Sequence, residues 1–385
     1  MTKITNTQNR IPFYVLILFL LAMSTSFSAQ EPGQSPFIDP NDGMMDMSKW
    51  LKTDHGFLPV PMVITEPAIG YGGGLSLVFF HETEDRPKPK GQFLTPSMTG
   101  LGGLYTENDT WAGGIFHFGS WKQDSIRYLG AVARTSINLT YYGPQNKPLF
   151  NGVDYNLDGL FTMHELMFRL PDTRLFLGGH FSYFGSKSTF DTDLNIPGID
   201  KWELDFNNFG LGPMFKYDTL DNMFTPNKGL RIDGQWIFYA DGDDMAGRNY
   251  QIIKTNARSY FPIADNMVLG WRLDGRFSTG NVPFYSLPFI DIRGIPAMRY
   301  QDKNAGTTEL ELRYNLTDRW ALVGFGGIGK TATSLDDFFE GNSHGAGGMG
   351  LRYLIAKEYG IYSGLDVACG PEDWVVYLQV GSAWR

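Results

Sequence analysis

The sequence has a single cysteine in 385 residues, Cys369, and after residue 29 it has no apolar run long enough to form a transmembrane helix. A lone cysteine excludes an intramolecular disulfide. A membrane-spanning helix needs about 20 predominantly apolar residues, so none is expected. Positive charge is also scarce. The chain has 32 Lys and Arg residues and 41 Asp and Glu residues. Its net charge of −9 argues against a nucleic-acid partner.

Motifs for enzymatic chemistry are incomplete or out of context. Residues 324–331, GFGGIGKT, satisfy the phosphate-loop pattern, but such a loop needs a buried parallel strand before it and a helix after it, and these flanks are typical of antiparallel strands. Residues 39–43, DPNDG, lack the closing glutamate of a calcium loop. The histidines show no metal-ligand spacing, and no nucleophile motif is present. We expect no enzyme, cofactor, metal or nucleotide, with an outer-membrane lipase as the enzymatic alternative.

Residues 1–29 are predicted to be a secretory signal peptide. Lys3 and Arg10 provide a basic start, an apolar run follows, and residues 24–29 are mostly small. The apolar run is shorter than a spanning helix, so we expect cleavage and export. Residues 30–55 begin with a Pro- and Asp-rich stretch and are predicted to form a short periplasmic tether or plug.

Residues 56–385 are predicted to form one all-β domain, a transmembrane antiparallel β-barrel of about 16 strands. In LGWRLDGRF (269–277) and ELELRYNL (309–316), large apolar side chains occupy one face and charges the other. This period of two is typical of half-buried strands, whose apolar face meets lipid in a membrane barrel. The 46 glycines argue against a helical bundle, because each interior glycine costs about 1 kcal/mol relative to alanine. The predicted strands start near Pro59, Ile69, Leu94, Asp109, Ser125, Leu157, Thr173, Asp205, Lys228, Arg248, Asp265, Gly306, Arg319, Ser343, Tyr359 and Asp373.

The connections between these strands are predicted to alternate between tight turns and longer loops. The tight ones fall at residues 171–172, 317–318 and 356–358, and the longer ones at 143–156, 187–204, 280–305 and 332–342. Outer-membrane barrels have short periplasmic turns and long external loops. The pattern therefore predicts a protein of the bacterial outer membrane, in contact with outer-membrane lipid.

The connection at residues 291–303, DIRGIPAMRYQDK, carries an Arg-Gly pair, Arg293 and Gly294, between the two clearly alternating segments. Both neighbouring strands place acidic residues on their polar faces. Arg293 is therefore predicted to fold back among these acids, inside the barrel.

Four stretches, in order, resemble the BamA/TamA-like surface-antigen barrels of the outer membrane. Residues 217–232, YDTLDNMFTPNKGLRI, are similar to the family's D-T-x-D-N … P-x-x-G turn and strand, and IRGIP stands where the family has its Arg-Gly loop. LELRYNL with LVGFGGIG resembles the next two strands. GMGLRYLI, YSGLDVA and YLQVGSAW resemble the closing strands. The similarity is strong over residues 205–385 and weaker over 56–204.

The resemblance implies a lock in which the loop arginine, here Arg293, packs against the inner wall. It implies Glu311 as the partner, at an inward position of the next strand, and Phe325 matches the family phenylalanine. The family aspartate is replaced by Gly327, which leaves Glu311 or Glu309 as the counter-charge. The alternative is a solvated loop arginine.

The seam between the first and last strands is predicted to be weakly paired. Pro59 and Pro61 fall in the first strand, where each removes a hydrogen-bond donor, and Gly381 lies near the end of the last strand. In the family this seam opens sideways to lipid. The alternative is that pairing simply begins at Met62.

The resemblance implies insertion or translocation of polypeptide or lipid at the outer membrane, with nascent outer-membrane or exported polypeptides as partners. A passive channel for small solutes is the alternative. Only residues 30–55 separate the predicted signal from the barrel, too few for a periplasmic polypeptide-transport domain, so we expect a barrel-only member.

Overall fold

The computed structural model describes residues 35–64, 69–81, 95–141, 153–196, 199–241, 249–340 and 343–384. The predicted signal peptide, residues 1–29, lies outside these described residues, as does the start of the predicted tether.

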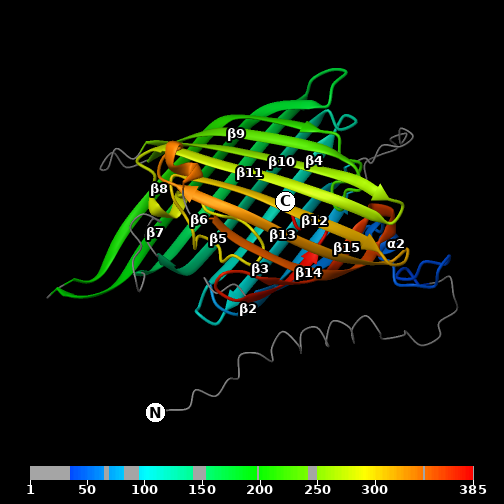
Figure 1. Ribbon diagram of the computed structural model, residues 1–385, viewed down its shortest axis with the longest axis horizontal. Coiled ribbons are helices and arrows are strands. Elements are labelled where there is room, and N and C mark those ends of the chain that lie inside the picture. The colour runs from blue at the N-terminus through cyan, green and yellow to red at the C-terminus, as the bar shows by residue number, and fades with distance from the viewer. Residues whose placement is uncertain are drawn as a thin grey trace, which may run out of the picture.

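Sixteen strands form one antiparallel sheet, in which each strand pairs with its neighbours in sequence order (Figure 1). This confirms the predicted all-β barrel fold. The largest offset between a predicted and an observed start is six residues, at β8, which begins at Ile199 and was expected near Asp205. The strands are β1 (Phe57–Ile64), β2 (Gly72–His81), β3 (Ser97–Thr106), β4 (Trp111–Trp121), β5 (Ile126–Tyr141), β6 (Val153–Arg169), β7 (Leu175–Ile196), β8 (Ile199–Asp218), β9 (Gly229–Asp241), β10 (Tyr250–Ala264), β11 (Met267–Gly280), β12 (Asn304–Asn315), β13 (Trp320–Ala332), β14 (Ser343–Ala356), β15 (Ile361–Cys369) and β16 (Trp374–Val380).

The two faces of the wall differ as the alternation predicts. On β11 and β12, Trp271 lies opposite Leu310, and both point outward with 41% and 50% of their surface exposed. One residue away, Arg272 lies opposite Glu309, and both point inward and are buried. The barrel therefore has an apolar outer wall and a charged lumen, the arrangement expected of a membrane barrel.

The barrel has a turn end, where the connections after even-numbered strands lie, and a loop end, where the connections after odd-numbered strands lie. At the turn end, residues 265–266 join β10 to β11 and residues 316–319 join β12 to β13. At the loop end, residues 281–303 join β11 to β12 and include the short 3₁₀ helix η1 (Phe284–Ser286).

One predicted loop is wrong. Residues 187–204 were expected to form a long connection, but β7 continues to Ile196 and β8 starts at Ile199, with Asp191 opposite Lys201. This hairpin projects beyond its neighbours at the loop end (Figure 1). A hairpin outside the apolar band needs no apolar face, so its polar composition resembles that of a loop although its backbone is paired.

Helical structure in the described part of the chain is confined to short pieces. They are α2 (Ser48–Leu51), η1, η2 (Asp336–Phe339) and η3 (Lys357–Tyr359). None of the helices among the described residues has the length and apolar character needed to cross a membrane.

Candidate functional site at the barrel seam

The Arg-Gly connection between β11 and β12 folds into the barrel rather than away from it. Ile290, Ile292 and Ile295 are buried together and pack against Tyr300 and against Ala346 of β14. This apolar packing fixes the loop on the inner wall, and Arg293 between these isoleucines is only 8% exposed.

Arg293 contacts three carboxylates and one aromatic ring. Its Nε and Nη2 donate to Oε1 of Glu309 at 2.9 and 2.7 Å, and its Nη1 donates to Oδ2 of Asp366 at 2.8 Å. Nη2 also lies 2.7 Å from Oε2 of Glu311, an ion pair without hydrogen-bond alignment. The guanidinium carbon lies 3.6 Å from the centre of the Phe325 ring. We call Arg293 with these four partners the Arg-Gly lock.

The sequence prediction missed Asp366, the partner on β15. Its carboxylate is fully buried and is shared with Arg352, whose Nη1 and Nη2 donate to its two oxygens at 2.5 and 2.9 Å. Asp366 stands at an inward position opposite Gly350. The sequence signal that could have identified Asp366 is its position as an isolated acid in the apolar stretch GLDVA.

Gly327 makes room for the carboxylate that replaces the expected aspartate. It lies directly opposite Glu309, and a Cβ at position 327 would lie 3.2 Å from the Glu309 Cβ and 2.8 Å from the Thr308 carbonyl oxygen. The absence of a side chain at 327 therefore leaves the space that Glu309 occupies beside Arg293.

Position 294 requires glycine, both for its backbone conformation and for the limited space around it. Its φ is +98°, a conformation that side chains disfavour, and a Cβ there would lie 3.1 Å from Ala346 and 3.2 Å from Ala368. Its N–H donates to the hydroxyl of Tyr377 at 3.0 Å. Because Tyr377 belongs to β16, the loop contacts the last strand of the barrel.

A second charged group of the loop is held by the neighbouring wall. Asp291 Oδ2 accepts from Arg276 at 2.7 Å and from Arg272 at 3.2 Å. The partial desolvation of this half-exposed carboxylate is outweighed by the two guanidinium groups, which hold the pKa of Asp291 below its ordinary value. Arg272 also lies 3.6 Å from Glu309, which joins this group to the Arg-Gly lock.

The seam between β1 and β16 has no backbone ladder. Both strands lie wholly within the described residues and contact each other, but no hydrogen-bonded register joins them, whereas β16 pairs with β15 from Trp374 to Val380. Pro59 and Pro61 lie in β1 as predicted, opposite Leu77 and Leu75 of β2. The two prolines are two residues apart, so both leave the same edge of β1 without a donor.

Gly381 directly follows the last residue of β16, with a φ of +78°, and its N–H donates to the Tyr362 carbonyl oxygen at 2.7 Å. The chain then turns inward, so that Trp384 is buried against Tyr260 and its carbonyl oxygen accepts from Arg258 Nη1 at 2.6 Å. Gly381 therefore redirects the chain into the lumen.

A segment ahead of β1 is held at the turn end by a second arginine. Arg319, in the turn between β12 and β13, is 2% exposed and donates to three aspartates of this segment. The distances are 2.7 Å to Asp39, 2.7 Å to Asp42 and 2.6 Å to Asp46. We call residues 38–52 the clasp.

The clasp connects the two sides of the seam. Met47 and Leu51 are buried in one cluster with Leu58 of β1 and Ile361 of β15. The Met47 N–H donates to the Ile355 carbonyl oxygen on β14 at 2.7 Å. Where β1 and β16 lack a ladder, the clasp supplies contacts that span the gap at the turn end.

The three clasp aspartates are stabilised as anions. The Asn41 backbone N–H and Lys357 lower the pKa of Asp39, and Arg319 and the Met44 N–H lower that of Asp42. Burial acts to raise the pKa of Asp46, but hydrogen bonds from Ser48 and Arg319 bring it below its ordinary value.

No protein-family profile and no curated protein matches the sequence. Solved structures do match its fold over 84% of the chain. BamA from Haemophilus ducreyi lacking POTRA domains 1–3 gives a TM-score of 0.54 at 11% identity, with 70% of that chain covered. CdiB from Escherichia coli gives 0.55 at 13% identity, and CdiB from Acinetobacter baumannii 0.53 at 12%. The chain spans 61% and 59% of these two CdiB chains.

The fold is that of the BamA and CdiB outer-membrane barrels. In this BamA-type barrel, the stretch that resembles the D-T-x-D-N motif forms the connection between β8 and β9 and folds across the turn end. Asn222 Nδ2 donates to the Tyr359 carbonyl oxygen at 2.9 Å, and the Phe224 ring lies 5.9 Å from that of Phe80. Arg313 of β12 donates to Asn227. Inward segments thus occupy both ends of the lumen.

The stretch that satisfies the phosphate-loop pattern is part of the barrel wall. Residues 324–331 lie entirely within β13, and Phe325 in that stretch supplies the ring of the Arg-Gly lock. The two glycines that define the pattern lie on a paired strand, with Gly324 opposite Leu312 and Gly329 opposite Thr307.

Proposed function

We propose that this protein lies in the bacterial outer membrane and moves polypeptide or lipid sideways between β1 and β16. The turn end, which carries short connections such as residues 265–266 and 316–319, faces the periplasm, and the loop end faces outward. The observation that carries the proposal is the seam, where two full strands lie in contact without a backbone ladder.

The seam costs little to open compared with any other strand pair. An unpaired backbone group in lipid costs several kcal/mol, so separating two laddered strands of a barrel is prohibitive. Between β1 and β16 that ladder is already missing. Strand edges that are not laddered to each other can pair with an incoming strand, which is the β-augmentation mode of recognition.

The Arg-Gly lock and the inward segments support movement at the seam over flow through the lumen. The lock joins β12, β13 and β15, and Gly294 joins β16 through Tyr377, so the wall on one side of the seam moves as a unit. Residues 219–228 and 381–384 occupy the turn end. We infer that these segments hinder solute flow along the barrel axis.

Opening of the seam requires the clasp to detach from one of its two sides. On one side, the clasp packs against Leu58 of β1, and Nε1 of its Trp50 donates to the Phe57 carbonyl oxygen at 2.9 Å. On the other side, it contacts β14 and β15. Release of its aspartates from Arg319 removes the ion pairs that hold the clasp at the turn end.

Depletion of the protein, followed by quantification of the outer-membrane proteome and lipids, tests the proposal. A joint fall of several barrel or exported proteins is expected if polypeptide is the cargo, and a shift in lipid composition if lipid is. Purified protein in planar bilayers provides the second arm, where we expect no large steady conductance. Unchanged proteome and lipids together with a steady conductance would instead establish a solute channel.

A further inference from the structure

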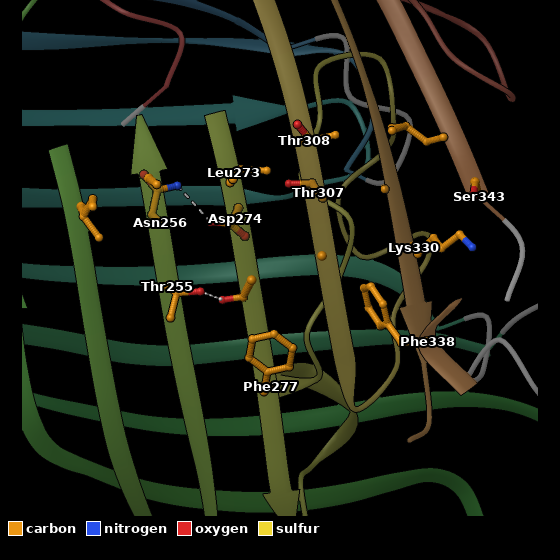
Figure 2. Close-up of a pocket in the computed structure, with 16 residues that line it drawn as sticks. Thr255, Asn256, Leu273, Asp274, Phe277, Thr307, Thr308, Lys330, Phe338 and Ser343 are labelled. Atoms are coloured by element: carbon orange, nitrogen blue, oxygen red, sulfur yellow. Dashed lines mark hydrogen bonds between the residues drawn. The ribbon is translucent and has the colours of Figure 1, made fainter. Parts of the chain in front are cut away.

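A hollow in the outer wall lies away from the seam, mainly on strands β10 to β13 (Figure 2). A cross-strand row of outward positions runs Thr255, Gly275, Gly306 and Lys330, each directly opposite the next. Two adjacent glycines in this row leave the wall without side chains. The hollow follows from that gap.

Large apolar side chains enclose the hollow. Leu273 and Ile328 border it toward the middle of the barrel, and Phe277 borders it toward the loop end. Phe338 of η2 folds down over the outer wall, close enough that a Cβ at position 306 would lie 2.7 Å from its ring (Figure 2). The cavity has a volume of about 670 Å³, within the usual range of small-molecule sites. We call it the wall groove.

We propose that the wall groove binds one acyl chain of a phosphate-bearing lipid, whose anionic head group meets Lys330. The surrounding outer wall is apolar and exposed, including Trp271, Leu310 and Ile328, so hydrocarbon is the medium that it contacts. The lining itself is mainly apolar, which suits a lipid chain and not a water-soluble ligand.

The position of Lys330 fits a head group. It lies two residues before the loop end of β13, whereas Ile328 lies one outward position deeper. With a rise of about 3.3 Å per residue, the ammonium group lies near the water boundary and the groove extends from it into the apolar band. A cation beside an apolar groove is complementary to a lipid phosphate with its chain.

This inference does not depend on movement at the seam, since β1 and β16 contribute nothing to the groove. The test uses the full protein in detergent, with equimolar phosphatidylglycerol and phosphatidylcholine added before native mass spectrometry. We expect one phosphatidylglycerol to be retained in preference to phosphatidylcholine. Lys330→Gln is expected to weaken that retention about tenfold, the effect of one lost hydrogen bond to a charged group.

Gly306→Leu fills the groove and is expected to abolish selective retention, because only the tip of the Phe338 side chain has to move. Gly324→Leu is the matched control, on β13 with nothing within 4 Å of its Cβ, and it should retain lipid like the wild type. Heat-modified gel mobility confirms folding of each variant. Equal retention of both lipids, or unaltered retention in Gly306→Leu, would overturn the proposal. So would complete displacement by inorganic phosphate, which would reveal a phosphate site without a chain groove.

Discussion

Two buried arginines each bind three carboxylates, Arg293 within the barrel and Arg319 at its turn end. Around Arg293 the carboxylates belong to the strands β12 and β15, and the arginine belongs to the loop. Around Arg319 the arrangement is reversed, because the arginine belongs to a tight turn of the wall and the carboxylates belong to the clasp.

The reversal changes what each group stabilises. Loss of Arg293 leaves carboxylates inside a wall that cannot move away, so the penalty falls on the whole barrel. Loss of Arg319 frees a segment whose three aspartates can enter water, so the penalty falls on the clasp. The same ion-pair chemistry therefore gives a structural lock within the barrel and a releasable contact at the turn end.

The largest effect is expected for Arg293→Ala. Removing one partner of a buried charge cluster typically costs about 3–5 kcal/mol, and we expect a loss of that size in the free energy of unfolding. Urea-induced unfolding in lipid vesicles measures it. Arg299→Ala, a more exposed arginine of the same loop paired with Glu372, is the control and should cost less than about 1 kcal/mol. Equal losses in the two variants would mean that Arg293 is no lock.

The two glutamates of the lock should differ. Glu309 accepts two hydrogen bonds from Arg293, and we expect Glu309→Gln to cost about 1.5–3 kcal/mol. Glu311 makes an ion pair without hydrogen-bond alignment, so Glu311→Gln should cost about 1 kcal/mol or less. Parallel unfolding curves rank the two, and the opposite ranking would restore Glu311 as the principal partner.

Arg319→Ala should leave the barrel intact and free the clasp. We expect the unfolding midpoint to change little while protease cleavage within residues 38–52 becomes much faster, because the three aspartates lose their common partner. Limited proteolysis with mass spectrometry locates the cuts. Lys52→Ala removes only an exposed pair with Glu358 and serves as the control. A clasp that stays protected without Arg319 would contradict its assignment as a releasable contact.

The smallest expected effect is a pH response of the clasp. The pKa values of Asp39, Asp42 and Asp46 are lowered below the ordinary 3.8, and that of Arg319 is raised. Depressed carboxyl pKa values mean that the stabilisation is fully present above about pH 4 and is lost as the pH falls through the lowered values. Proteolysis with an acid-active protease should therefore show no change from pH 7 to pH 5 and release below pH 4. Release near pH 6 would require a different titrating group.

The strand pattern was readable from the sequence because each strand has one face toward an apolar medium, and Arg293 was readable because acids flank its loop. Asp366 was missed because its partner lies 73 residues away and no local pattern links them. The role of Arg319 was missed for the same reason, since Asp39 is 280 residues distant. The inward turn of the chain at Gly381 was not predicted, because a positive φ leaves no trace in the alternation.

The central claim is that the seam between β1 and β16 has to open. In a Cys369→Ala background, a cysteine at Val63 of β1 combined with one at Val376 or Leu378 of β16 gives the seam pairs to be tested. Val367 with Val376, directly opposite on β15 and β16, gives the control pair. After each pair is oxidised, we measure whether the protein restores outer-membrane composition in depleted cells. We predict that seam cross-links abolish restoration, that reduction recovers it and that the control pair has no effect. Full restoration by a protein with a closed seam would contradict the account.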